Sequence, residues 1–127
     1  MQTNNCIKNL LKLIHVLQDN SKNLSCLDEG CLKPFLGPSL VDTCYDTRVI
    51  TLYTKNGELF TANYYDDNNV VNMSFLFRIQ KVDDDCCTLL ILVNDGDEYI
   101  STRQTITVKI SCICAIKCIE DTVVTNL

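Results

Sequence analysis

The sequence has few of the residues on which most enzyme active sites are built. It contains one histidine and four glycines in 127 residues, and it has no tryptophan. No Gly-x-Ser-x-Gly elbow, phosphate-cradling glycine loop or His-Glu-x-x-His pair occurs in it. A cysteine nucleophile would need His15 as its base, and His15 flanks the apolar stripe of a predicted helix. The sequence therefore predicts a protein that is not an enzyme and that uses no cofactor.

Basic residues are also scarce. Eleven Lys and Arg stand against sixteen Asp and Glu, which gives a net charge of −5 and a pI near 4.6. The basic residues are scattered singly, so no basic stripe could neutralise a row of phosphates. The longest wholly apolar runs, such as 89–93, are far too short to cross a bilayer. We therefore expect neither nucleic acid nor a membrane as a partner.

No secretory signal is visible, although nine cysteines are present, a content close to that of disulfide-bonded secreted proteins. Residues 1–18 begin polar and interrupt their apolar residues with Lys8, Lys12 and His15, unlike the unbroken apolar core of a signal peptide. We therefore expect synthesis in a reducing cytoplasm, followed by metal binding or by later oxidation. Because nine is an odd number, at least one thiol has no partner within its own chain.

Hydrophobic periodicity predicts one helix at the start of the chain. Apolar residues recur with helical spacing at Ile7, Leu10, Leu11, Ile14 and Leu17. A connector follows at 26–46, where Gly and Pro punctuate a segment that holds Cys26, Cys31 and Cys44. We expect one structural domain overall, composed of an N-terminal helical arm (1–22) and a β-rich part (23–127).

The β-rich part begins with a predicted hairpin at 48–64. Its two strands flank Asn56-Gly57, a pair favoured in type I′ turns. That turn would place Lys55 opposite Glu58, Tyr53 opposite Phe60 and Thr51 opposite Ala62. Residues 66–72 look like a polar, flexible link.

Three further segments predict strands. In 74–82, Phe75, Phe77 and Ile79 alternate with Arg78 and Gln80, as in a half-buried strand. The apolar run 86–93 is typical of a central strand and is followed by a turn at 94–97. In 105–119 the even positions would share one face of a single extended segment and align three thiols. The predicted fold class is therefore mainly β (α+β), with an N-terminal amphipathic helix followed by an antiparallel β-sandwich-like domain.

The thiols of the last segment allow an alternative, a zinc-binding module. Cys112, Cys114 and Cys118 could supply three ligands, with Cys86 or Cys87 as the fourth. The usual Cys-x-x-Cys spacing is absent, which weakens this alternative. The acidic runs 83–85 and 95–98 lack the spacing of a calcium loop and are better explained as solvated turns. A thiol-dependent enzyme would need one unusually acidic cysteine, and it stays open as the weakest alternative.

Several motifs in order along the chain resemble one family, the cysteine-rich spore coat proteins of the coat protein Z type, which include Y-type coat and exosporium proteins. The resemblance also includes the amphipathic N-terminal segment as far as Leu17-Gln18-Asp19. The motifs are Cys26-x4-Cys31 with Pro34-Phe35-Leu36-Gly37, Thr47-Arg48 with Leu52-Tyr53-Thr54-Lys55-x-Gly57 and Phe60, Phe77-Arg78-Ile79, Val82-Asp83-Asp84-Asp85-x-Cys87, Ile106-Thr107-Val108, and Ser111-Cys112-x-Cys114-Ala115-Ile116-x-Cys118. Residues 94–105 form a shorter connection than in relatives, which puts ring size and lattice geometry in doubt.

The resemblance implies a structural protein that self-assembles, through rings that are expected to be hexameric, into a two-dimensional lattice with other coat proteins. It implies synthesis in the mother-cell cytoplasm and a place at the spore surface, in the crust or the exosporium basal layer. It also implies disulfide reinforcement after the mother cell lyses. From chain mobility we expect the intermolecular disulfides at Cys6, Cys26, Cys31 and Cys44, before the strand positions Cys86, Cys87, Cys112, Cys114 and Cys118.

Overall fold

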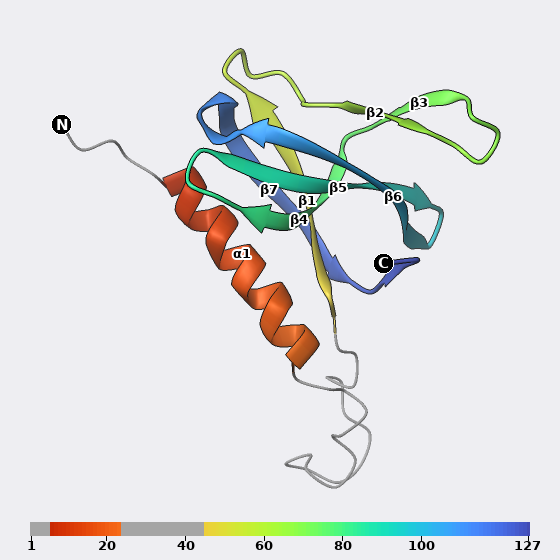
Figure 1. Ribbon diagram of the computed structural model, residues 1–127, viewed down its shortest axis with the longest axis horizontal. Coiled ribbons are helices and arrows are strands. Elements are labelled where there is room, and N and C mark those ends of the chain that lie inside the picture. The colour runs from red at the N-terminus through yellow and green to blue at the C-terminus, as the bar shows by residue number, and fades with distance from the viewer. Residues whose placement is uncertain (1–5, 24–44) are drawn as a thin grey trace, which may run out of the picture.

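The computed structural model describes residues 6–23 and 45–127 as one helix and eight strands (Figure 1). This confirms the predicted fold class, mainly β with an N-terminal helix. Residues 26–44 of the predicted connector at 26–46 lie outside the described residues, and the division of the chain at residue 22 stays a prediction. The elements are α1 (Cys6–Asn23), β1 (Thr47–Thr54), β2 (Ala62–Tyr65), β3 (Val71–Ser74), β4 (Leu76–Val82), β5 (Cys86–Asp95), β6 (Glu98–Lys109), a 3₁₀ turn (Ile110–Cys112), β7 (Ile113–Thr122) and β8 (Val124–Thr125).

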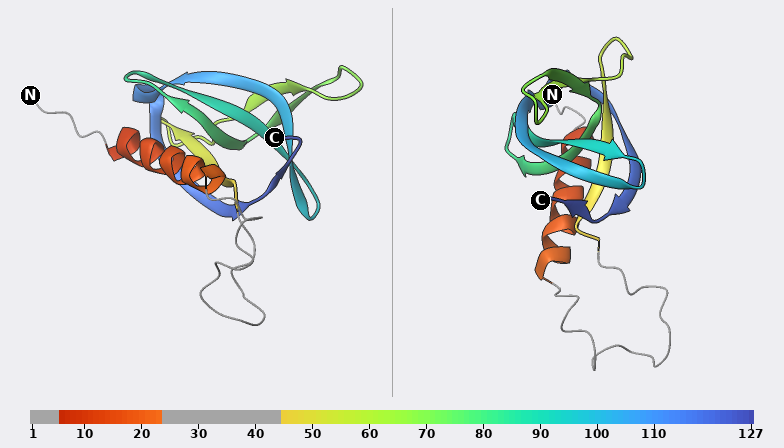
Figure 2. Two further views of the ribbon diagram at one scale, coloured as in Figure 1. Left: turned by 60° about the horizontal axis from the view of Figure 1, so that its bottom comes forward. Right: turned by 90° about the vertical axis from the view of Figure 1, so that its right-hand side faces the viewer.

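Six strands form one sheet in the order β7-β1-β4-β5-β6-β8, and β2 pairs with β3 in a separate hairpin. All pairs are antiparallel except β6 with β8. Only Val123 separates β7, at one edge of the sheet, from β8 at the other. The sheet must therefore curl until its two edges approach each other, and Figure 2 shows this curl from the side.

The helix packs on the sheet through the face that the sequence predicts. Leu11 and Ile14 are fully buried, and Ile7 and Leu10 pack partly buried beside them. Leu17, at the end of the predicted stripe, is instead 44% exposed. No helix in the described part of the chain is long and apolar enough to span a bilayer.

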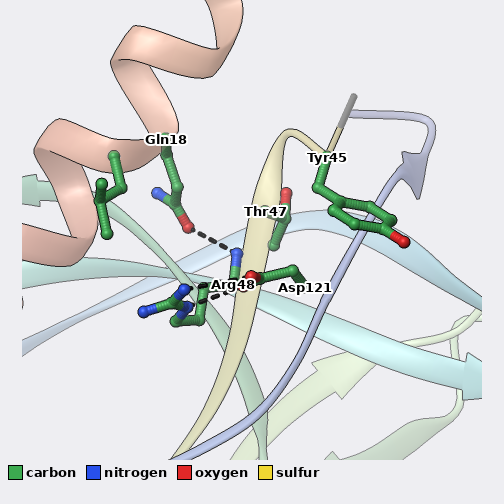
Figure 3. Close-up of a pocket in the computed structure, with 6 residues that line it drawn as sticks. Gln18, Tyr45, Thr47, Arg48 and Asp121 are labelled. Carbon is green, nitrogen blue, oxygen red and sulfur yellow. Dashed lines mark hydrogen bonds and ion pairs between the residues drawn. The ribbon is translucent and has the colours of Figure 1, made fainter. Parts of the chain in front are cut away.

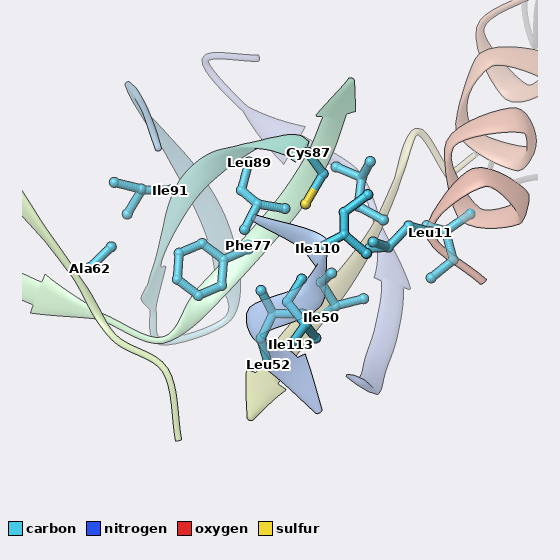
Figure 4. Packing of buried hydrophobic residues seen from close by; sticks show 12 residues of the cluster. Leu11, Ile50, Leu52, Ala62, Phe77, Cys87, Leu89, Ile91, Ile110 and Ile113 are labelled. Carbon is cyan, nitrogen blue, oxygen red and sulfur yellow. The ribbon is translucent and has the colours of Figure 1, made fainter. Parts of the chain in front are cut away.

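Two apolar clusters lie on opposite faces of the sheet, as the alternation of buried residues along β1, β4 and β5 requires. The larger cluster joins α1 to the sheet and includes Phe77, Leu89 and Cys87 (Figure 4). The smaller cluster, on the other face, includes Leu76, Leu92 and Val124, so β8 closes over it. The run 86–93 is the central strand that the sequence predicts, buried on both faces.

The long hairpin predicted at 48–64 is wrong beyond its turn. The turn closes with two hydrogen bonds, Gly57 N–H to Thr54 O (2.9 Å) and Thr54 N–H to Glu58 O (2.9 Å), and Gly57 has a positive φ of 78°. This is a three-residue loop with a glycine bulge rather than a type I′ turn, and it moves the register by one residue. Tyr53 therefore pairs with Leu59 instead of Phe60, and β1 takes β7 and β4 as its partners.

The expected polar link at 66–72 is an ordered turn that joins β2 to β3. The Asp66 carboxylate accepts the N–H groups of Asn68 (2.9 Å) and Val70 (2.9 Å) and the amide of Asn72 (2.9 Å). These bonds, led by that from Val70, lower the pKa of Asp66. An aspartate that satisfies the backbone of a turn therefore orders a segment whose composition is typical of a flexible link.

The single segment predicted at 105–119 is two strands. A 3₁₀ turn at 110–112 separates β6 from β7, and the Ile110 N–H donates to Asp85 O (2.7 Å). This break reverses the chain, so β7 runs along β1 while β6 runs along β5. The shared face predicted for Cys112 and the later thiols is therefore wrong, because Cys112 lies in the turn.

Candidate functional site: the exposed thiols

The cysteines of the described residues divide into a buried and an exposed group. Cys87 is 1% exposed and Cys86 is half-buried, side by side at the start of β5. Cys6, Cys112, Cys114 and Cys118 are exposed. Cys26, Cys31 and Cys44 lie outside the described residues. The exposed group therefore includes one arm position named from the sequence and all three thiols of the last segment.

Strand β7 carries two of the exposed thiols along the edge of the sheet. It pairs with β1 on one side, and in the described part of the chain no strand pairs with it on the other. Ile116 lies opposite Leu52 and Cys118 opposite Ile50, so both are on the sheet face that α1 covers. Register shifts fall at Cys114 and at Ile119, and they leave 115–118 as the regular stretch between two bulges.

Cys118 lies beside an ion pair that ties β7 to β1. Arg48 Nε donates to Asp121 Oδ1 (2.7 Å), and Arg48 Nη2 donates to Asp121 Oδ2 (3.1 Å). Asp121 is the largest cause of the raised pKa of Arg48, and Cys118 raises it further; the same ion pair lowers the pKa of Asp121. Figure 3 shows this pair at a shallow hollow of about 180 Å³ between α1 and β1, next to Gln18.

The buried thiol of Cys87 is chemically unlike the others. Burial, with a smaller contribution from the neighbouring Cys86, raises its pKa to about 11. Since the thiolate is the reactive form, a thiol with this pKa is almost entirely inert at neutral pH. Cys87 packs in the larger apolar cluster (Figure 4) and acts as a small core residue.

This difference predicts the order in which the thiols react. With iodoacetamide at neutral pH in reductant-free buffer, we expect Cys114 and Cys118 to be alkylated in the folded protein and Cys87 to be alkylated only after denaturation. A rise of about two pKa units, to about 11, lowers the thiolate fraction about 100-fold, and burial adds a steric barrier. Peptide mass spectrometry measures the rates, and equal rates for Cys87 and Cys114 would contradict the assignment.

The other sequence-based candidates lie apart from one another. His15 forms a helical i,i+4 contact with Asp19 (Nε2 to Oδ2, 3.7 Å). Residues 83–85 form an exposed turn, in which Asp84 pairs with Lys8 of α1 at 3.4 Å. Among the described residues, no group of three or more His, Cys, Asp or Glu side chains could hold a metal ion. The alternative zinc ligands are therefore not gathered, since Cys87 is buried and Cys114 is exposed at the sheet edge.

Arg78 is a buried residue whose position the sequence pattern does not reveal. It is 3% exposed, and its guanidinium donates to Thr47 Oγ1 (2.8 Å), to the Asp46 carbonyl (3.2 Å) and to Gln80 Oε1. Burial lowers its pKa, and the charges of Asp46 and Asp19 partly oppose that effect. Arg78 thus ties β4 to the start of β1.

Comparison with known proteins gives one match. A sequence model described as Spore coat protein Z matches residues 1–99, which include α1 and the strands from β1 to β5. No curated protein and no solved structure shows a significant similarity to the chain.

Proposed function

Because the chain belongs to the spore coat protein Z family, whose model matches more than half of it, we propose that it is a structural subunit that assembles into an ordered layer. Its role is that of a structural spore coat protein at the spore surface. The assembly is a two-dimensional lattice, expected to be built from hexameric rings, in the crust or the exosporium basal layer. The subunit binds other copies of itself and other coat proteins. This role does not require catalysis.

The observation that supports this proposal is the family match together with the distribution of the thiols. The fold buries two apolar clusters, so noncovalent packing supports the domain before any crosslink forms. The thiols of Cys6, Cys112, Cys114 and Cys118 are exposed at the surface, where a thiol of another molecule can reach them. The proposed order of events is therefore folding, ordered packing of copies, and then oxidation in the lysing mother cell.

A lattice of this kind needs two types of contact. One closes the ring and the other joins rings, and each can be heterologous because rotation or translation repeats it. We assign intermolecular disulfides to Cys6, at the start of α1, and to Cys26, Cys31 and Cys44 of the connector. A single disulfide contributes about 2–4 kcal/mol within one chain. A subunit held by several crosslinks must lose all of them to escape, so durability belongs to the array.

The release of monomers tests this proposal. We expect oxidised, pelleted assemblies to release monomers only when heat or denaturant is combined with reductant. The double variant Cys6→Ser with Cys26→Ser keeps the other crosslinks, so heating should release its monomers at a lower reductant concentration than the unchanged protein needs. Gel electrophoresis of the supernatant after centrifugation measures the release.

The matched control is Cys86→Ser, which removes a half-buried thiol and should leave the release unchanged. If heating releases monomers of the double variant and of the unchanged protein at the same reductant concentration, the assignment to Cys6 and the connector is wrong. If no pelleted material forms under any condition, the proposal of self-assembly fails.

A further inference from the structure

We propose that the free edge of β7 is an isologous contact between two copies of the chain, in which Cys114 of each copy forms a disulfide with Cys118 of the other. This inference rests on the proposed function, because it names one of the surfaces through which copies associate. The unpaired strand edge and the spacing of its two thiols support it.

The edge of β7 offers backbone groups to another strand. In the described residues β1 is the only strand that pairs with β7, and from Cys114 to Asp121 all residues of β7 except Ile116 are exposed. Near the end of β7, the Glu120 carboxylate accepts the Tyr99 hydroxyl of β6 (2.6 Å), so the free edge is the part before Glu120. An exposed edge strand with unpaired N–H and C=O groups is a template for another chain. Two bulges restrict the regular stretch to 115–118, and Lys117 adds a charge there. Bulges and charges limit indiscriminate pairing, so this edge should pair weakly and in a defined register.

One symmetric register lets both thiols of β7 form a link at the same time. If two copies pair antiparallel about a twofold axis at Ile116, residues whose numbers add to 232 lie opposite each other. Cys114, at the bulge that borders the regular stretch, then comes opposite the second copy's Cys118 at the end of that stretch, and the reverse pair forms by symmetry. Opposite residues on antiparallel strands have Cα atoms about 4.5 or 5.5 Å apart. Both distances fall within the range of about 4.4–6.8 Å that a disulfide requires.

The same two thiols cannot join within one chain. They are four residues apart on one strand, at about 3.3 Å per residue, so their Cα atoms are about 13 Å apart. A disulfide cannot form beyond about 7 Å without movement of the backbone. A link between Cys114 and Cys118 therefore identifies a contact between two copies without ambiguity.

The charges of β7 are compatible with this register. Lys117 lies opposite Ala115 of the other copy, a small residue that leaves room for the lysine chain. Lys117 is the one charged residue between Cys114 and Cys118, so no two like charges lie directly opposite each other in the paired stretch. Self-pairing in this register therefore has no direct electrostatic penalty.

The oxidation balances with molecular oxygen as the acceptor. Each disulfide forms one S–S bond and removes two protons and two electrons from two S–H groups. The symmetric pair of bonds removes four of each, and one O₂ accepts them to give two molecules of water. In the test, oxidised glutathione replaces O₂, and each disulfide formed converts one molecule of it into two of reduced glutathione.

Peptide mapping of the full-length protein oxidised with glutathione tests the pair. Trypsin cuts after Lys109 and Lys117, so Cys118 lies in a different peptide from Cys112 and Cys114. We expect the peptide 110–117 linked to the peptide 118–127. Cys114→Ser alone and Cys118→Ser alone should lose this linked species. An equimolar mixture of the two variants should restore it, because one copy then supplies each thiol, and Cys112→Ser should leave it unchanged.

Two substitutions at Ala115 test the register itself. Ala115→Lys places a lysine opposite Lys117 twice in each pair of copies, whereas Ala115→Glu places a glutamate there. In reductant, the lysine variant should lower the association constant of the pair about fivefold, and the glutamate variant should preserve or raise it. Analytical ultracentrifugation measures both.

The outcomes separate this inference from the proposed function. Ordered assemblies that form in reductant but yield no linked 114–118 peptide on oxidation would overturn the β7 contact and leave self-assembly intact. A 114–118 link in isolated pairs that never form larger assemblies would support the contact and contradict the lattice. Loss of the linked peptide in Cys112→Ser but not in Cys114→Ser, or equal effects of the two Ala115 variants, would also overturn the inference.

Discussion

Replacing Phe77 with alanine is expected to lower the free energy of unfolding by about 3–5 kcal/mol, the largest effect we expect from a single substitution. Phe77 is fully buried, and its ring lies 5.5 Å from that of Phe60, centroid to centroid. Within the sheet, Phe77 also lies opposite Ile50 of β1 and Ile91 of β5. The pairing with Ile50 joins β4 to β1. Truncation therefore leaves a cavity where three strands and the residue-60 segment meet.

Phe75→Ala is the matched control, because Phe75 is 45% exposed two positions earlier in the chain. We expect it to change the free energy of unfolding by less than about 0.5 kcal/mol. Urea denaturation followed by circular dichroism measures both variants. Similar losses for the two would mean that the packing of Phe77 described here does not support the sheet.

Gln18→Leu is expected to lower the free energy of unfolding by about 2–5 kcal/mol, because it leaves two backbone groups without partners. Gln18 is 3% exposed, its Nε2 donates to the Ile79 carbonyl (2.8 Å), and its Oε1 accepts the Arg48 N–H (3.1 Å). One side chain thus bonds α1 to both β4 and β1. Leucine keeps most of the volume, so the expected loss comes from unmet hydrogen bonds rather than from a cavity.

The control for this variant is Asn9→Leu, the same type of change at an exposed helix position. It should be neutral or slightly stabilising, since leucine favours helices more than asparagine does. The same urea titration measures it. If Gln18→Leu is as harmless as Asn9→Leu, then the helix is held by Leu11 and Ile14 alone and the bridge is dispensable.

Local patterns predict the elements of this fold better than their partners. The spacing of Leu11 and Ile14 gives the helix and its buried face, and the apolar run at 86–93 gives the central strand. The partners depend on single residues. Gly57, which has a positive φ, creates a bulge that shifts the register of the 48–64 turn, and the 3₁₀ turn after Lys109 redirects β7 to the edge of the sheet. Periodicity contains no information about either event.

The faces of β4 show the same limit. Alternation predicts Phe75, Phe77 and Ile79 as the buried set and Arg78 as solvated. Phe77 and Ile79 are buried as predicted. Arg78 is also buried, because the curled sheet covers both faces of β4, and Phe75 is exposed, because it lies just before that strand. The candidate site is predicted only in part for a similar reason. The sequence identifies the thiols, whereas their exposure depends on which strand becomes an edge.

Electron microscopy of the purified protein, with and without reductant, tests the central claim that copies order themselves by noncovalent contacts before disulfides reinforce them. We predict sheets or other ordered arrays in both conditions, and we predict that only the arrays kept in reductant fall apart on heating. Dispersed monomers in both conditions would contradict self-assembly, and arrays that require oxidation to form would contradict the order of events.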